Sequence, residues 1–299
     1  MLTSLFVEID DFHQQYQDHI HELTQKGLIE PEQTNTPKRN RAFIMTASEV
    51  MTIIVFFHIK GFRSFKHYYL YYVCQHLDTE FPHRVSYNRF VELMSGSCYA
   101  LTAFLHTRFG NCTGIQFIDS TPLRVCNNRR IQQHKVFKAV AARGKCSLGY
   151  FYGFKLHLVI NERGELLSFS ISKGNLDDRK PVDWLTQRLS GRLFADRGYI
   201  DQALSHRLHN RGLTLITKQK KNMKPRLMLL ADRILLRKRA LIESVNDQLK
   251  NISQIEHTRH RCLNNFVVNV VSGLIAYTFQ DKLPSINMTK HDIQALANI

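Results

Sequence analysis

The first hundred or so residues carry apolar positions at the spacing of helices. Thr46-Ala47-Ser48-Glu49 has the form of a capping box, in which a Thr side chain and a Glu three residues later start a helix. Gly61 ends this helix, Ser64 opens a second one with the sequence SFKHYYLYYVCQHL, and a third runs from Tyr87 to Met94. The first helix has one apolar face, made by Val50, Ile53, Ile54 and Phe57. The pattern predicts an all-helical N-terminal region.

From about residue 114 the chain changes to short apolar segments of strand length. The turn sequence Asn161-Glu162-Arg163-Gly164 joins two of them, so they are predicted to form a hairpin. Helices are predicted from Asp177 to Arg188, from Asp201 to His209 and from Arg226 to Ile252. The predicted strands are residues 115–118, 150–160, 165–172, 192–195 and 213–217. This order of strands and helices indicates a mixed α/β domain.

The net charge of the chain indicates what kind of partner it binds. The chain has 299 residues, 43% of them hydrophobic, with a net charge of +16 and a pI of about 9.7. Such a surplus indicates a polyanionic partner, most commonly nucleic acid, although a merely basic globular protein has the same composition. We expect a cytoplasmic protein without membrane spans. The N-terminus is acidic where a signal peptide is basic, the apolar segment Phe266–Phe279 is interrupted by Asn269, and the six cysteines are scattered.

Basic residues stand at the ends of the three N-terminal helices, namely Arg63, Lys66, Arg84 and Arg89. Three short helices with basic ends are typical of a helix-turn-helix-like DNA-binding unit. A helical cap with basic edges would have the same pattern, because the helix-turn-helix has no strict sequence code. Both interpretations stay open at this point.

Two aspartates each follow a short apolar strand. Asp119 ends the sequence FID, and Asp196 ends the sequence FAD. In open α/β sheets, sites gather beyond the ends of the strands. Either Asp alone is more typical of a loop start or a helix cap, but the pair in a basic chain favours a shared site.

A third acid lies on the predicted long helix. Glu243 belongs to a polar stripe whose members lie 4, 3 and 4 residues apart, within roughly 60° around the helix. The stripe consists of Arg239, Glu243, Asn246 and Lys250. The apolar positions, which we expect to pack on the sheet, are Ile234, Leu241, Val245, Leu249 and Ile252. A simple surface ion pair from Arg239 to Glu243 is the alternative to a functional role for the glutamate.

Three carboxylates without Cys or His companions are hard oxygen ligands, which suit Mg²⁺ or Mn²⁺ better than zinc. Two such ions can activate an attacking oxygen and stabilise a leaving one at a phosphodiester. The surrounding sequence is basic: residues 120–161 contain no acid, and residues 206–242 contain only Asp232. From the first of these segments we take Arg129, Arg130, Lys138 and Lys155 as candidate DNA contacts.

The order Asp119, Asp196, Glu243 resembles the DDE triad of transposases with a ribonuclease H-like core. The sequence FADRGYI around Asp196 is similar to the second-aspartate motif of insertion-sequence enzymes, and Arg239-x3-Glu243-x6-Lys250 resembles their C-terminal signature. The segment from TASEVMTIIVFFHIKGFRSFKHYY to SYNRFVELM resembles the insertion-sequence 982 family, so the likeness covers roughly residues 40 to 280. The tyrosine of the signature is replaced by Leu236 here, so its DNA contact cannot be carried over.

The resemblance implies that Asp119, Asp196 and Glu243 are the catalytic residues and bind two ions of Mg²⁺ or Mn²⁺. It implies Arg239 and Lys250 as DNA contacts. The fold that it implies is a ribonuclease H-like mixed sheet flanked by helices and preceded by an all-helical N-terminal domain. The expected divisions of the chain are a DNA-binding domain at residues 1–110, a catalytic domain at 111–280 and a tail at 281–299.

The function expected from these features is that of a bacterial transposase. It would bind the terminal inverted repeats of its insertion sequence, cleave the DNA ends and transfer them into target DNA. The expected partners are DNA and further copies of the chain, as a homodimer or higher oligomer, in a cytoplasmic enzyme associated with the nucleoid. A DDE-fold nuclease without strand transfer, or a DNA-binding protein whose catalytic domain has decayed, are the alternatives.

Overall fold

The computed structural model describes residues 1–30, 44–147, 149–219, 223, 227–256 and 259–287. The polar segment around residues 31–40 and most of the predicted tail lie outside the described residues. The chain forms two compact units, Met1–Thr107 with Ile252–Tyr277 and Arg108–Asn251 with Thr278–Ile299. The sequence placed residues up to 280 in the second domain, whereas the contacts of residues 252–277 group them with the N-terminal helices.

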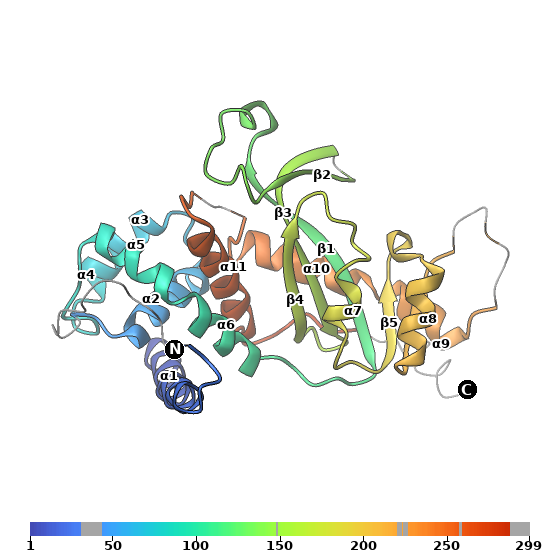
Figure 1. The fold of residues 1–299 in the computed structure, drawn as a ribbon, viewed down its shortest axis with the longest axis horizontal. Helices are drawn as coiled ribbons and strands as arrows, with labels where there is room; N and C mark the ends of the chain where they lie inside the picture. The colour runs from blue at the N-terminus through green and yellow to red at the C-terminus, as the bar shows by residue number, and fades with distance from the viewer. Residues whose placement is uncertain (31–43, 148, 220–222, 224–226, 257–258, 288–299) are drawn as a thin grey trace. The chain divides into compact units, whose positions relative to one another are not determined.

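The first unit is helical, as predicted. Thr46 and Glu49 form the predicted capping box, in which the Thr46 hydroxyl accepts from the Glu49 N–H at 3.1 Å and the Glu49 carboxylate accepts from the Thr46 N–H at 2.7 Å. Its elements are α1 (Leu2–Gln25), α2 (Ala47–Ile59), α3 (Phe65–His67), the π-helix η1 (Tyr68–Val73), α4 (Cys74–His76), α5 (Tyr87–Gly96), α6 (Cys98–Thr107) and α11 (Leu263–Thr278) (Figure 1).

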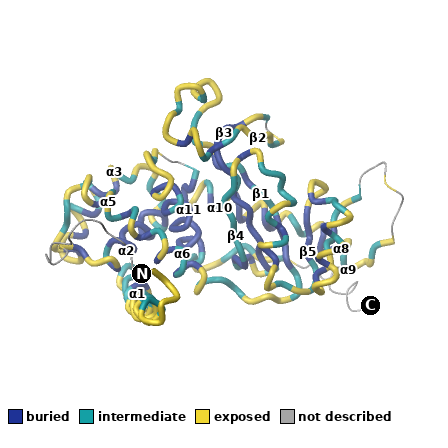
Figure 2. The backbone as a smooth tube through the Cα atoms, in the orientation of Figure 1, coloured by how far each residue is buried: buried dark blue, intermediate teal, exposed yellow. Residues whose placement is uncertain are grey.

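Two helices form the centre of this unit. Helices α2 and α11 are buried along most of their length, as Figure 2 shows, and helices that are apolar on all sides belong in a protein interior. His58 at the end of α2 donates from Nδ1 to the Ser253 carbonyl at 2.5 Å, which connects α2 to the segment before α11. None of the described helices is long and apolar enough to cross a membrane.

The second unit contains a mixed sheet with strand order β2-β3-β1-β5-β6, and β4 pairs with β3 as well. Strands β2, β3, β4 and β1 pair antiparallel, and β1, β5 and β6 pair parallel. The predicted hairpin is confirmed, because β3 and β4 flank the turn at Asn161–Gly164. The strands are β1 (Ile115–Cys126), β2 (Ala142–Cys146), β3 (Gly149–Asn161), β4 (Leu166–Lys173), β5 (Gly191–Ala195) and β6 (Leu213–Thr217).

Helices cover both faces of this sheet. An apolar cluster joins α7 and α8 to Ile118 of β1 and to Leu193 and Ala195 of β5. Successive side chains of a strand point to opposite faces, so Phe117 and Phe194 lie on the other face, where their rings are 5.6 Å apart. Contacts of α9 with β5 and of α10 with β1 cover that second face. The helical elements of this unit are η2 (Asn128–Arg130), α7 (Val182–Leu185), η3 (Arg197–Tyr199), α8 (Gln202–Asn210), α9 (Leu230–Arg237) and α10 (Ala240–Asn251).

Two helix predictions were wrong in length. The helix predicted from Arg226 to Ile252 is interrupted between α9 and α10, where Leu241 N–H and Ile242 N–H bond to carbonyls three residues back instead of four. The helix predicted to reach Arg188 is the single turn α7. After Thr186, the N–H groups of Gln187 and Leu189 bond to carbonyls only three residues back, and the chain then turns toward β5.

Candidate active site

Asp119 and Asp196 lie at the same level of the sheet. The parallel pairing of β1 with β5 ends with Phe117 opposite Phe194, and each aspartate comes two residues after one of these phenylalanines. By the alternation of side chains, both aspartates point to the face that α10 covers. One expectation needs correction, because Asp119 does not end its strand: β1 continues to Cys126 through its pairing with β3.

The polar stripe of α10 faces β1 at this level. Asn246 donates from Nδ2 to the Asp119 carboxylate at 3.3 Å, and Lys250 donates from Nζ to the Pro122 carbonyl at 2.8 Å. Pro122 fits here because β1 has already separated from β5, so its missing N–H removes no bond of the ladder on that side. The apolar positions Ile234, Leu241, Val245 and Leu249 are buried as predicted, but Ile252 follows the end of α10 and is exposed.

The carboxylates influence one another's charge. Burial raises the pKa of Asp119 to about 6, and the nearby charges of Glu243 and Asp196 act in the same direction. The charge of Arg239 and the backbone N–H of Ser120 oppose the rise. Asp119 therefore lies within electrostatic reach of the other two carboxylates, in surroundings that disfavour a third negative charge.

Arg239 neutralises part of this negative charge. Its guanidinium donates from Nη2 to the Glu243 carboxylate at 2.7 Å, with 14% of the Arg239 side chain and 58% of the Glu243 side chain exposed. The ion pair that was the alternative to a functional role for Glu243 is therefore formed. Within the described part of the chain, no three His, Cys, Asp or Glu side chains are gathered closely enough to hold a metal ion.

The chemistry of the neighbouring oxygen atoms nevertheless fits Mg²⁺ or Mn²⁺. Asn246, which the sequence placed in the stripe without a role, contacts Asp119, and its buried Oδ1 has no hydrogen-bond partner among the described residues. With the carboxylates of Asp119, Asp196 and Glu243, this amide oxygen makes a set of hard donors, the kind that divalent magnesium or manganese binds. The sequence indicated Asn246 only by its position three residues after Glu243, in the same polar stripe.

The turn after Asp196 adds a buried tyrosine. Asp196 precedes the turn η3, and within the described residues its side chain makes no capping bond, so capping does not explain this aspartate. Tyr199 at the end of η3 is buried, and burial followed by the charges of Asp119 and Asp178 raises its pKa well above the usual value. Its hydroxyl therefore stays protonated beside Asp119.

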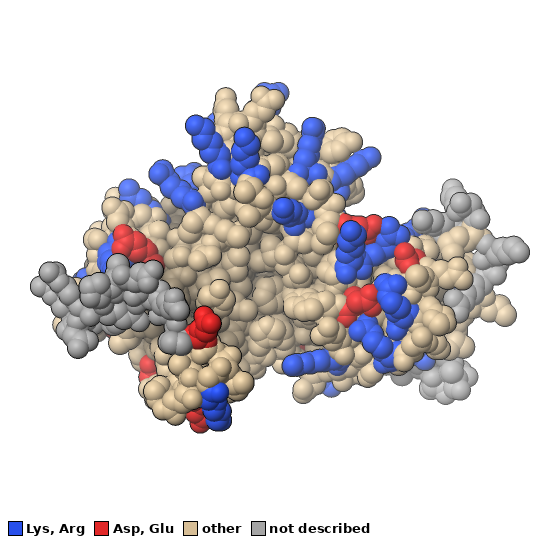
Figure 3. Space-filling model, in the orientation of Figure 1, with Lys and Arg blue, Asp and Glu red and all other residues tan. Residues whose placement is uncertain are grey.

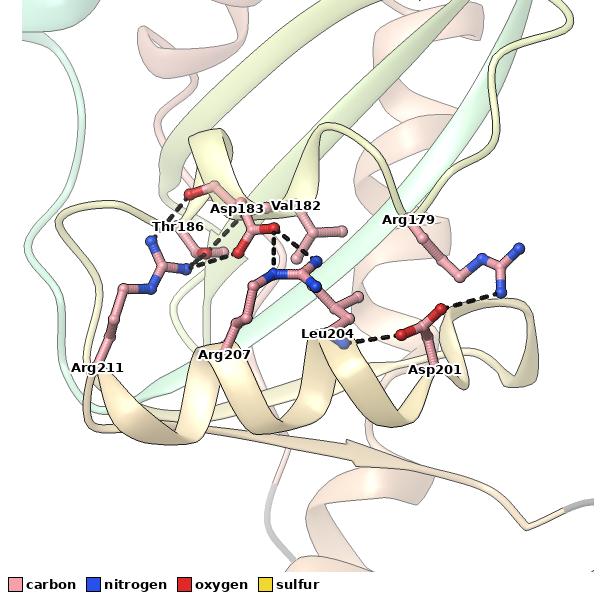
Figure 4. Close-up of polar contacts among 8 residues, drawn as sticks. All are labelled: Arg179, Val182, Asp183, Thr186, Asp201, Leu204, Arg207 and Arg211. Carbon is pink, nitrogen blue, oxygen red and sulfur yellow. Dashed lines mark hydrogen bonds and ion pairs between the residues drawn. The ribbon is translucent and has the colours of Figure 1, made fainter.

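A network of ion pairs holds α8 against α7 and so fixes the chain that follows η3 (Figure 4). Asp183 of α7 accepts from Arg207 at 2.9 Å and from Arg211 at 3.4 Å. Asp201, where a helix was predicted to begin, caps α8 by accepting from the Leu204 N–H at 2.7 Å. Arg207 and Arg211 were counted in the basic segment 206–242, but each has an acidic partner on α7.

The candidate DNA contacts divide into two groups. Lys155 is only 12% exposed and donates to Asp178 at 2.8 Å and to the Leu176 carbonyl at 2.9 Å, which favours a structural role; its contact with DNA stays a prediction. Arg129, Arg130 and Lys138 are exposed. They lie on the segment between β1 and β3, where Figure 3 shows basic side chains gathered at the top of the view.

We call this segment, residues 124–150, the basic arm. Arg143 and Lys145 of β2 lie over the ring of Tyr150, at 4.8 Å and 5.8 Å from its centroid. Strand β2 was not predicted, because its sequence ARGKC lacks alternating apolar residues. It forms by pairing with the first residues of β3, so the arm is an extension of the sheet.

A comparison with protein families identifies the second unit. A family model described as a transposase DDE domain matches residues 109–263, slightly more than half of the chain. No curated protein matches the chain. The mixed sheet with flanking helices, together with the preceding helical region, is consistent with the ribonuclease H-like fold that was predicted. The protein belongs to the family of transposases with a DDE domain.

Proposed function

We propose that the protein is the transposase of a bacterial insertion sequence. It would bind the terminal inverted repeats of its element, cleave the DNA ends by metal-dependent hydrolysis and join them to target DNA. The observation that carries the proposal is the common level of Asp119 on β1 and Asp196 directly after the parallel strand β5, with Asp119 in contact with the polar stripe of α10. The resemblance of the N-terminal segment favours the insertion-sequence 982 family.

In this proposal Asp119, Asp196 and Glu243 bind two ions of Mg²⁺ or Mn²⁺, and Asn246 orients Asp119. When bound, the ions activate the attacking oxygen and stabilise the leaving oxygen of the phosphodiester. Glu243 reaches this position only after it separates from Arg239, because their ion pair holds the carboxylate. The released guanidinium then lies beside the carboxylates, where a DNA phosphate would provide its new partner.

DNA contacts extend from this site over the surface of the second unit. Arg239 and Lys250 would contact the DNA near the cleaved bond. Arg129, Arg130 and Lys138 would bind phosphates farther along the duplex, since all three are exposed and the basic arm contains no acid. The helical region would recognise the terminal repeat. As two ends must be brought together for joining, the active form would be a homodimer or a higher oligomer.

Replacing Glu243 by Gln tests this proposal. The substitution keeps the size of the side chain but removes the charge that holds a divalent cation, so cleavage of terminal-repeat DNA in Mg²⁺ should fall by about a thousandfold or more. Binding of the same DNA should be retained, because the basic arm is unchanged. Asp247→Asn is the matched control, since Asp247 is an exposed acid of α10 that bonds to Asn251 within the helix.

The outcomes separate the alternatives. A Glu243→Gln enzyme that cleaves at the rate of the Asp247→Asn control would exclude Glu243 as a metal ligand. A wild-type protein that cleaves DNA but never joins it to a target duplex would be a DDE-fold nuclease. A wild-type protein that binds the repeat and does not cleave in Mg²⁺ or Mn²⁺ would be a DNA-binding protein with a decayed catalytic domain.

A further inference from the structure

The helical unit contains a cavity that the proposed chemistry does not use. It has a volume of about 590 Å³ and lies between the loop before α3, the start of α5 and the first turns of α11 with the segment that precedes them. All of its lining residues belong to this one unit. Its size is in the range of cavities that hold small organic ligands.

The charged residues that line the cavity all have the same sign. Its lining includes Arg63, Lys66, Arg259 and Arg261, and among the described lining residues none is Asp or Glu. These four side chains come from two parts of the chain almost two hundred residues apart, and each residue is exposed. Four cations around one cavity repel one another unless an anion lies between them, and guanidinium groups are well suited to phosphate.

Aromatic rings form another part of the wall. Phe65 and Tyr87 both line the cavity and both are only partly buried, so some ring surface remains accessible. The Lys66 ammonium lies 5.9 Å from the Tyr87 ring centroid, which places a cation directly beside an aromatic surface. Unstacked bases bind proteins by stacking on such rings while cationic groups hold the phosphate.

The deeper lining is polar and incompletely paired. Asn265 is only 6% exposed; its Nδ2 donates to the Val91 carbonyl at 3.3 Å, whereas its buried Oδ1 has no hydrogen-bond partner among the described residues. A buried acceptor without a partner costs free energy, and an incoming N–H group would remove that cost. His260, also in the lining, has a pKa lowered to about 4 by burial, so at neutral pH it adds no charge there.

We propose that this cavity binds one unpaired nucleotide of DNA. Its phosphate lies among Arg63, Lys66, Arg259 and Arg261, its base lies against Phe65 and Tyr87, and the amide oxygen of Asn265 accepts from an exocyclic amino group of the base. The proposal rests on the proposed function, because it takes DNA as the partner. It assigns to the helical unit a preference for an unpaired base that carries an exocyclic amino group (adenine, cytosine or guanine, not thymine) beyond its expected affinity for duplex DNA.

Fluorescence anisotropy with full-length protein in EDTA tests this assignment without cleavage. The probes are one labelled 20-base-pair duplex in three forms: fully paired, with a single bulged adenine, and with a bulged abasic nucleotide. The adenine bulge should bind about tenfold more tightly than the paired duplex. The abasic bulge should lose most of this advantage, because it keeps the phosphate and lacks the base.

Variants assign the contacts within the cavity. Asn265→Leu should reduce the advantage of the adenine bulge over the abasic bulge, because stacking on Phe65 and Tyr87 remains. Arg63→Gln with Arg261→Gln should weaken binding of both bulges. Lys26→Gln is the matched control, since Lys26 is an exposed cation of the same unit that pairs with Glu22 and does not line the cavity. If Asn265→Leu does not fold, as judged by circular dichroism, Tyr87→Ala replaces it and should reduce the same advantage.

Equal affinity for the three duplexes, or variants that bind like wild type, would overturn the cavity assignment. That result would leave the proposed transposase function intact, because cleavage in Mg²⁺ is measured separately with Glu243→Gln. Conversely, a protein that prefers the adenine bulge but does not cleave in Mg²⁺ would support the cavity and contradict the proposed function.

Discussion

Replacing Arg239 by Gln should lower the stability of the metal-free protein. The substitution removes the partner of Glu243 at 2.7 Å and the positive charge that opposes the raised pKa of Asp119. An exposed pair is worth up to about 1 kcal/mol and breaking a buried one costs about 3–5 kcal/mol, so this half-buried pair should contribute about 2 kcal/mol. For a unit of this size, that loss corresponds to a Tm lower by about 4–8 °C.

Divalent cations should reverse much of this loss. Metal bound by the three carboxylates would supply the positive charge that Arg239 supplies in its absence. Thermal denaturation is measured with EDTA and with Mn²⁺, on the wild type, Arg239→Gln and the control Arg237→Gln. Arg237 is an exposed cation of α9 two residues before Arg239. The Tm increase caused by Mn²⁺ should be largest for Arg239→Gln.

Two results would refute this reasoning. If Arg239→Gln melts like Arg237→Gln in EDTA, the guanidinium does not compensate the carboxylates. If Arg239→Gln is destabilised equally with and without Mn²⁺, the loss of stability comes from packing. In that case the metal does not replace the positive charge of Arg239 beside the carboxylates. A DNA contact without any role in charge compensation would give the first of these results.

Three further predictions follow from contacts in the structure. Asn246→Ala removes the donor to Asp119 and an unpaired buried oxygen, so Mn²⁺ affinity measured by calorimetry should fall by about 10-fold or more; an unchanged affinity would contradict its orienting role. Arg129→Gln with Arg130→Gln should reduce the slope of the logarithm of the DNA association constant against the logarithm of salt concentration by about 2. Lys155→Met should leave that slope unchanged and lower the Tm. A slope that falls in Lys155→Met and stays unchanged in the double arginine variant would make Lys155 the phosphate contact. Burial lowers the pKa of His58 from 6.5 to about 4, so the unfolded chain binds its proton first as pH falls. His58 should contribute almost no pH dependence above about pH 7.5 and a loss of about 2 kcal/mol at pH 5, seen in urea titrations as a steeper acid loss for wild type than for His58→Gln.

Local patterns in the sequence were sufficient to predict several elements of both units. The capping box at Thr46 and the turn at Asn161–Gly164 were predictable because each depends on residues within four positions of one another. The stripe on α10 was predictable because helical periodicity places Asn246 and Lys250 on one face, and both contact β1.

Features that depend on distant residues could not be predicted in this way. Strand β2 exists because β3 provides a pairing edge, and its own residues carry no strand pattern. The charges of Lys155 and Arg207 suggested phosphate contacts, yet their acidic partners Asp178 and Asp183 lie more than twenty residues away along the chain. The helix α11 follows the candidate catalytic residues in sequence but belongs to the helical unit, and this grouping depends on tertiary contacts.

The location of bound Mn²⁺ tests the central claim most directly. Crystals of the protein with terminal-repeat DNA are soaked in Mn²⁺, and anomalous difference density is measured for the wild type and for Asp119→Asn. We predict density bridging the carboxylates of Asp119 and Asp196 in the wild type, with Glu243 separated from Arg239 and turned toward the ions, and loss of that density in Asp119→Asn. Anomalous density confined to other residues, or unchanged in Asp119→Asn, would contradict the assignment of these three carboxylates as the metal site.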